Sequence, residues 1–140
     1  MRAAVVGVVA AGILLLGAAP AAPPEPPVSF ISVDELKQLL DGGAKADVID
    51  VRTWDRYVEQ HIKGARSMPI RSVAERAREL SRTGLVVFYR TCPNALARGA
   101  SDIVYGLGWR NQRVLEEGLP GWVAKGYPVE GTRPHATPAH

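Results

Sequence analysis

The chain has 140 residues, of which 46% are hydrophobic and 22% are charged, with 17 lysines and arginines against 14 aspartates and glutamates. This length allows one domain of ordinary size, and the composition excludes disordered, collagen-like and disulfide-rich proteins. A single cysteine, Cys92, excludes an intramolecular disulfide, a zinc site with two or more thiolates, and a two-thiol redox cycle within the chain.

The first residues have the pattern of an export signal. Arg2 is followed by an uncharged, apolar stretch from Ala3 to Gly17 and then by small residues. A short basic start, an apolar core and a small-residue end are typical of a secretory signal peptide, so we predict that residues 1–21 are removed on export to the periplasm or the medium. The alternative is an uncleaved segment that anchors the chain in a membrane, because the apolar stretch approaches spanning length.

Proline-rich and polar stretches mark the two ends of the predicted domain. Five prolines between Pro20 and Pro27 indicate a polyproline-like linker over residues 22–28. Residues 131–140 are polar and aperiodic, which is typical of a flexible tail. The folded unit is therefore expected over residues 29–130.

The first half of this unit begins with a helix and a strand. Ser32 and Glu35 form a capping box, which predicts a helix from residue 33 until Gly42 and Gly43 end it. Residues 48–51 are a short β-branched run and predict a strand. A helix followed at once by such a strand is the first sign of an α/β fold.

Apolar periodicity continues in the second half. Ser72 and Glu75 are a second capping pair and predict another helix. Residues 85–89 are continuously apolar between turn residues, which suits a strand buried on both faces of a parallel sheet. Strands that alternate with helices indicate a mostly parallel sheet, whose ligands bind beyond the carboxyl ends of the strands.

The last elements follow the loop that contains Cys92. Apolar residues recur at i, i+3, i+4 and i+7 from Ala100 to Leu107, and Gly108 is expected to end this helix in the left-handed conformation. Residues 113–115 predict a final short strand, and residues 119–125 predict one or two helical turns.

The position and surroundings of Cys92 point to a nucleophile. Between a strand end and a helix start, unpaired N–H groups and the helix dipole favour the thiolate. No acidic residue occurs from Leu80 to Ser101, whereas arginines flank the loop. A thiolate in such a ring of donors can attack an anion, although a lone cysteine is often only a small buried hydrophobe.

The predicted substrate-binding residues are Arg90, Pro93, Asn94, Ala95, Leu96, Ala97 and Arg98. Asp50, at an earlier strand end, is expected to support the loop through hydrogen bonds.

Two separated motifs resemble the signatures of rhodanese-like domains. The first comprises Asp50-Val51-Arg52 and His61-Ile62-Lys63-Gly64-Ala65, and the second comprises Gly108-Trp109 and Glu117-Gly118-Leu119-Pro120-Gly121-Trp122. The resemblance spans about residues 29–130. It implies an α/β fold with a central parallel five-stranded sheet flanked by helices, and a nucleophile at Cys92. In that family the cysteine takes a sulfane sulfur from a donor such as thiosulfate, carries it as a persulfide, and passes it to cyanide or a thiol.

The cysteine loop departs from the usual family pattern, Cys-x-x-Gly-x-Arg. Ala95 stands in place of the glycine, and the arginine comes one position later, at Arg98. The resulting Cys-x5-Arg spacing resembles protein phosphatases and some arsenate reductases of the same architecture, although Thr91 replaces the histidine expected before the cysteine. A third reading is a non-catalytic rhodanese-like module that binds a partner or a sulfur oxyanion.

The sequence thus predicts an exported sulfurtransferase with a small anionic sulfur donor and a thiol acceptor as its partners. We find no nucleotide-binding glycine motif and no nucleic-acid signature, so we expect no cofactor, no metal ion and no nucleic acid. After cleavage of the signal, no stable membrane insertion is expected.

Overall fold

The computed structural model describes residues 27–91 and 95–133, together with residues 3–5, 7, 9–13, 17, 19 and 20 of the N-terminal segment. Across these described residues, no helix is long and apolar enough to cross a membrane. The predicted signal peptide and linker lie partly outside them, and both stay predictions.

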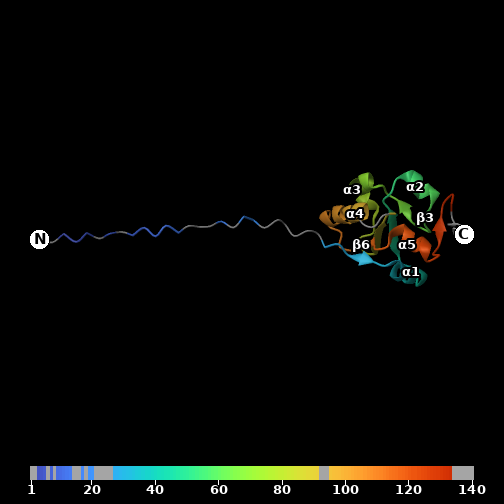
Figure 1. Cartoon of the computed structure of the whole chain (residues 1–140), viewed down its shortest axis with the longest axis horizontal. Coiled ribbons are helices and arrows are strands. Elements are labelled where there is room, and N and C mark those ends of the chain that lie inside the picture. Colours follow the sequence, from blue (N-terminus) through green and yellow to red (C-terminus); the bar gives the residue numbers. More distant parts are fainter. Residues whose placement is uncertain are drawn as a thin grey trace.

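A five-stranded sheet forms the centre of the domain (Figure 1). Every pairing in it is parallel, and the strand order is β1-β6-β5-β2-β4. The strands are β1 (Phe30–Ile31), β2 (Ala46–Asp50), β4 (Arg66–Ser67), β5 (Leu85–Tyr89) and β6 (Gln112–Leu115). This confirms the predicted fold class. Because β1 and β4 have only two residues each, no periodicity in the sequence marks them.

Helices cover both faces of the sheet (Figure 1). On one face lie α1 (Val33–Asp41) and α5 (Gly118–Ala124), and on the other lie α3 (Val73–Arg76) and α4 (Ala95–Gly106). The remaining elements are α2 (Trp54–Glu59), the 3-10 turns η1 (Ile70–Ser72) and η2 (Ala77–Glu79), and the antiparallel pair of β3 (His61–Ile62) and β7 (Val129–Glu130).

The central strand β5 separates two hydrophobic cores. Val86 and Phe88 pack on the α3 and α4 side, whereas Val87 and Tyr89 pack on the α1 and α5 side. All four side chains are 0% exposed, as expected for the continuous apolar run in the sequence. Burying such a side chain contributes about 1.5–3 kcal/mol, so β5 stabilises the cores on both faces of the sheet.

The start of α1 is capped twice. The Ser32 hydroxyl accepts a hydrogen bond from the Glu35 amide at 3.1 Å, which confirms Ser32 as the residue that caps the start of this helix. The Glu117 carboxylate, 84 positions away in the sequence, accepts a bond from the Val33 amide at 2.8 Å. The second cap ties α1 to the residue before α5, and it links the two helices that cover one face.

Two details of the predicted helices are wrong. Ser72 makes no capping hydrogen bond, because it ends the turn η1 with helical dihedral angles instead of the extended ones that an N-cap needs. Leu107, predicted on the buried face of its helix, is 48% exposed because α4 ends at Gly106. Gly108 has the predicted left-handed conformation, with φ of +104°.

The domain extends past its predicted end. The Thr132 amide donates to the Val58 carbonyl at 2.9 Å, and the Arg133 amide donates to the Glu59 carbonyl at 2.8 Å. Gly131 has φ of +129°, and a Cβ atom there would lie 2.5 Å from the Glu59 carbonyl oxygen. The predicted tail therefore begins three residues too early, because these backbone bonds attach residues 131–133 to α2. Residues 134–140 lie outside the described part of the chain.

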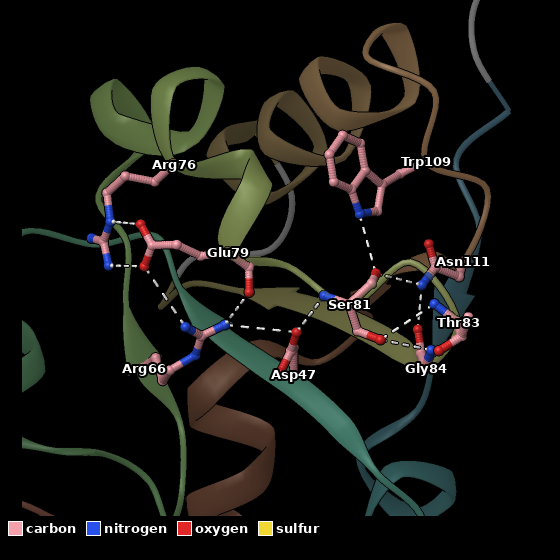
Figure 2. Close-up of polar contacts among 9 residues, drawn as sticks. All are labelled: Asp47, Arg66, Arg76, Glu79, Ser81, Thr83, Gly84, Trp109 and Asn111. Atoms are coloured by element: carbon pink, nitrogen blue, oxygen red, sulfur yellow. Dashed lines mark hydrogen bonds and ion pairs between the residues drawn. The ribbon is translucent and has the colours of Figure 1, made fainter.

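A polar network closes the amino ends of β2 and β5, opposite the predicted ligand side (Figure 2). The Asp47 carboxylate accepts a bond from the Ser81 amide at 2.7 Å, and the Trp109 indole donates to the Ser81 carbonyl at 3.1 Å. The Asn111 amide donates to the carbonyls of both Ser81 and Gly84. This network stabilises the turn before β5 and leaves the other end of the sheet for ligands.

Replacing Asn111 by alanine is expected to lower the free energy of unfolding by about 1–3 kcal/mol, because the Gly84 carbonyl loses its Asn111 donor and the Ser81 carbonyl is left with the Trp109 indole. Urea unfolding measures the loss. Gln38→Ala is the matched control, since it removes an amide from the exposed face of α1. Equal stabilities of the two variants would contradict a structural role for Asn111.

Candidate active site

A cavity of about 1200 Å³ opens at the carboxyl edge of the sheet, where parallel α/β proteins bind ligands. Residues 51–53 line it after β2, and residues 90–91 line it after β5. Further walls come from α2, η1, Leu119 of α5 and residues 132–133. Five segments that are distant in the sequence thus converge at the predicted end of the sheet.

The charged side chains that line the cavity are mostly cationic. One carboxylate, that of Glu59, is among the described lining residues. A concave surface of one sign focuses its field and attracts ligands of the opposite sign. The five arginines are Arg52, Arg56, Arg71, Arg90 and Arg133.

Two of these arginines have carboxylate partners. Arg52 pairs with the buried Asp50 at 2.6 Å, and Arg56 lies 3.6 Å from the Glu59 carboxylate. For the other three, no carboxylate of the described residues lies within ion-pair distance. These three arginines, whose charges are available to an anionic ligand, are Arg71, Arg90 and Arg133.

Arg52, which lines the cavity, forms a buried ion pair with Asp50. Asp50 is 0% exposed and Arg52 is 7% exposed. The Asp50 carboxylate accepts bonds from the Arg52 backbone amide at 3.0 Å and from its Nε at 2.9 Å and Nη2 at 2.6 Å, and Nη2 also donates to the Gln60 carbonyl at 2.6 Å. Burial alone would lower the pKa of Arg52, but the hydrogen bonds and charge of Asp50 outweigh it and raise the pKa. Arg52 therefore stays charged and fixed. We predicted that Asp50 supports the cysteine loop through hydrogen bonds. Among the described residues, the hydrogen bonds of its carboxylate are made with Arg52.

Tyr89 lies beside this pair at the end of β5. Its hydroxyl accepts a bond from the Ile62 amide at 3.1 Å. Burial, and then the charge of Asp50, raise the pKa of Tyr89 far above its usual value. The phenol stays protonated at any physiological pH, so it serves as a structural group and not as a base.

The Arg90 backbone is held against the start of α5. The Leu119 amide donates to the Arg90 carbonyl at 2.9 Å. Gly118 has φ of +61°, and a Cβ atom at this position would lie only 2.5 Å from the same carbonyl oxygen. The Glu117-Gly118-Leu119 motif thus fixes the residue that stands two positions before Cys92.

A Gly118→Ala substitution is expected to lower the free energy of unfolding by about 2–3 kcal/mol, because it combines left-handed strain with a clash against Arg90. Gly126→Ala is the matched control: its φ is +71° but nothing lies within 4 Å of the added Cβ. We expect a loss of only about 1 kcal/mol there. Equal losses in urea unfolding would contradict the close contact at Gly118.

The predicted loop residues lie in different places. Cys92, Pro93 and Asn94 lie outside the described residues. Arg90, Thr91 and Leu96 line the cavity, so it is bordered by one described residue pair before the cysteine segment and by one residue after it. Of the remaining two, Ala95 is exposed at the start of α4 and Ala97 is buried in the core.

The structure does not bring Arg98 to the described cavity lining. Its guanidinium carbon lies 5.9 Å from the centre of the Phe30 ring, above β1. Residues two apart on a helix point roughly 200° apart, and Leu96 is the one that faces the cavity. The predicted pair of Arg90 and Arg98 is therefore separated by the direction of α4.

Four cavity arginines were missed in the sequence. Arg52 follows a strand at its carboxyl end, which is a usable signal for a ligand-facing residue. Arg56, Arg71 and Arg133 have no such signal, because they reach the cavity only through the packing of α2, η1 and the segment after β7.

The chemistry that this lining can perform is anion binding. The described lining residues include no histidine and only one carboxylate, and Tyr89 is held protonated behind them. General acid or base catalysis therefore has few candidates here. The arrangement suits a nucleophile supplied by the adjacent segment, with the arginines stabilising the negative charge of its substrate.

Comparisons with known proteins agree with this architecture. The pattern of the family described as Rhodanese-like domain matches residues 32–125. Over 114 residues the chain is 32% identical to arsenate reductase 2.1 of Oryza sativa subsp. japonica. The matched region covers 73% of this chain and 71% of that protein.

Solved structures give the same result. The solution structure of a rhodanese-like domain from Anabaena is 28% identical, with a TM-score of 0.69 over 79% of this chain and 85% of that one. The human single-domain sulfurtransferase TSTD1 is 20% identical, with a TM-score of 0.63 over 71% of this chain and 98% of that one, and this likeness shows the fold alone. Since the family pattern covers more than half of the sequence and the sheet has the matching topology, the chain belongs to the rhodanese-like domain family.

Proposed function

We propose that this protein is a sulfurtransferase that carries a sulfane sulfur on Cys92. The observation that carries the proposal is the arginine-lined cavity, whose described residues flank the segment with the chain's single cysteine. Membership of the rhodanese-like family supports the same reaction class. An anionic donor such as thiosulfate would otherwise be repelled by a thiolate, and Arg90 supplies the compensating charge.

The reaction proceeds in two displacements. The Cys92 thiolate attacks the outer sulfur of thiosulfate, the S–S bond of the donor breaks, and sulfite leaves with the electron pair. An acceptor, cyanide or a thiolate, then attacks the outer sulfur of the Cys92 persulfide and releases the Cys92 thiolate. Because the chain has no second cysteine, the sulfur leaves only to an external acceptor.

Intact mass measurement tests this function. Incubation with thiosulfate should add about 32 Da, one sulfur atom, to the reduced protein, and cyanide should remove it and yield thiocyanate. Absence of the adduct at saturating thiosulfate would overturn thiosulfate transfer. If no chemistry occurs but sulfite binds, the protein is a non-catalytic rhodanese-like module.

A second candidate is an arsenate reductase or a phosphatase that uses the same cysteine. The 32% identity to arsenate reductase 2.1 and the Cys-x5-Arg spacing favour it. The position of Arg98 over Phe30, away from the described cavity lining, argues against it, because such a loop needs its arginine on the oxyanion. Arsenate reduction with a thiol reductant, or hydrolysis of an aryl phosphate, without persulfide formation would decide for this candidate.

We also propose that the chain is exported and that residues 1–21 are removed. The support is the signal-like pattern of its N-terminal segment. A mature N-terminus at Ala22 is expected in the exported fraction. Retention of Met1 in the membrane fraction would instead indicate an anchor.

A further inference from the structure

The cavity is much larger than the substrates that define the proposed reaction. Thiosulfate has five non-hydrogen atoms and cyanide has two, whereas pockets of roughly 300–1000 Å³ hold drug-sized ligands. At about 1200 Å³, most of this space would stay unfilled by either small ion. The cavity therefore has room for a reactant larger than either ion.

Two of the unbalanced arginines lie away from the cysteine segment in the fold. Arg71 belongs to η1, whose backbone is attached to the end of β2 by the bond from the Ile70 amide to the Val51 carbonyl at 3.2 Å. Arg133 follows β7, and its carbonyl accepts a bond from the Gln60 side chain at 3.1 Å. Both residues have fixed backbones, so each presents a cation at a defined wall of the cavity.

The charges around these arginines favour a ligand with more than one negative group. Asp50 balances Arg52, and Glu59, the acid in the described lining, lies against Arg56. Arg71 and Arg133 come from different walls, which suits two separate anionic groups on one molecule. Carboxylates are the groups that the planar arginine fork binds best, together with phosphates.

We propose that Arg71 and Arg133 form an anion subsite that holds the two carboxylates of a small thiol acceptor. This proposal rests on the sulfurtransferase function proposed above. The bound acceptor's thiolate forms a bond to the outer sulfur of the Cys92 persulfide, and the S–S bond of that persulfide breaks. Cys92 returns as a thiolate, and the acceptor leaves as a persulfide with its carboxylates unchanged.

Single-turnover discharge tests the subsite apart from the donor step. Protein is loaded with thiosulfate, freed of donor, checked for the adduct by mass, and mixed with mercaptosuccinate, 3-mercaptopropionate or 2-mercaptoethanol. These thiols carry two, one and no carboxylates. Rates are compared per thiolate, since the attacking group is the thiolate. We expect the native protein to discharge to mercaptosuccinate at least about tenfold faster than to 2-mercaptoethanol.

Charge-removing variants assign the preference to the two residues. Arg71→Gln and Arg133→Gln should each reduce the mercaptosuccinate rate about tenfold relative to the 2-mercaptoethanol rate of the same variant. Arg78→Gln is the matched control, because Arg78 is exposed on η2 and is not among the cavity residues. Raising the salt concentration should weaken the preference of the native protein.

The failures of the two proposals are distinguishable. If no adduct forms on the native protein, the sulfurtransferase function fails and no discharge is measured. If the adduct forms but the three thiols react equally, the subsite is overturned. The subsite is also overturned if each variant, Arg71→Gln or Arg133→Gln, slows the reaction with all three thiols by the same factor. That result would indicate that the arginines act through the overall electrostatic potential of the cavity and do not bind carboxylates.

Discussion

Replacing Cys92 by serine is expected to abolish the thiosulfate-dependent mass increase and all sulfur transfer to cyanide. The hydroxyl of serine is not ionised near neutral pH and forms no persulfide, whereas the chain offers no other thiol to take its place. Intact mass spectrometry detects the adduct of about 32 Da directly, and thiocyanate release measures turnover.

Stability provides the control for this variant. The serine side chain has nearly the shape of cysteine, so urea unfolding should give a free energy within about 1 kcal/mol of the native value. The Arg78→Gln variant, which changes an exposed charge outside the cavity, should keep the full adduct. An adduct that persists in Cys92→Ser after denaturation would contradict the proposed nucleophile.

The second large effect is expected from Asp50→Asn. This change keeps the shape of the side chain but leaves the charge of Arg52, which is 7% exposed, without its counter-ion. Breaking a buried pair on one side costs about 3–5 kcal/mol, because the remaining charge stays desolvated. Urea unfolding should therefore show a much lower midpoint with an unchanged slope.

Two comparisons make this result specific. Asp41→Asn removes a carboxylate that pairs with Lys37 on the exposed side of α1, and we expect a loss below about 0.5 kcal/mol. In the double variant Asp50→Asn/Arg52→Gln the buried charge is gone, so it should be more stable than Asp50→Asn alone. A loss at Asp50 no greater than that at Asp41 would show that the buried pair does not stabilise the fold.

Much of the fold could be predicted from local patterns in the sequence. The helix cap at Ser32, the apolar run of β5 and the left-handed Gly108 each depend on neighbouring residues, and the structure confirms all three. The second capping pair was wrong, because the turn η1 that precedes α3 changes the backbone at Ser72. The two-residue strands β1 and β4 are too short to leave a pattern.

The candidate site was only partly predictable. Arg90 and Leu96 were expected near the ligand, because they flank the loop after the most buried strand, and both line the cavity. Arg98 was expected there by its spacing from Cys92, but the direction of α4 places it over Phe30. Arg71 and Arg133 are 62 positions apart in the sequence, yet both line the same cavity. No local sequence motif predicts that they lie on one cavity.

By itself, the sequence determined the class of fold, the position of the single thiol after the central strand, and the family signatures around it. These features depend on hydrophobic periodicity and on residues close together in the chain. Only the tertiary structure decided which charges surround the cavity: Asp50 neutralises Arg52, α4 turns Arg98 away, and residues 132–133 supply a wall. The reason is physical, since an electrostatic site depends on distances between side chains, and those distances are set by how the helices and loops pack on the sheet.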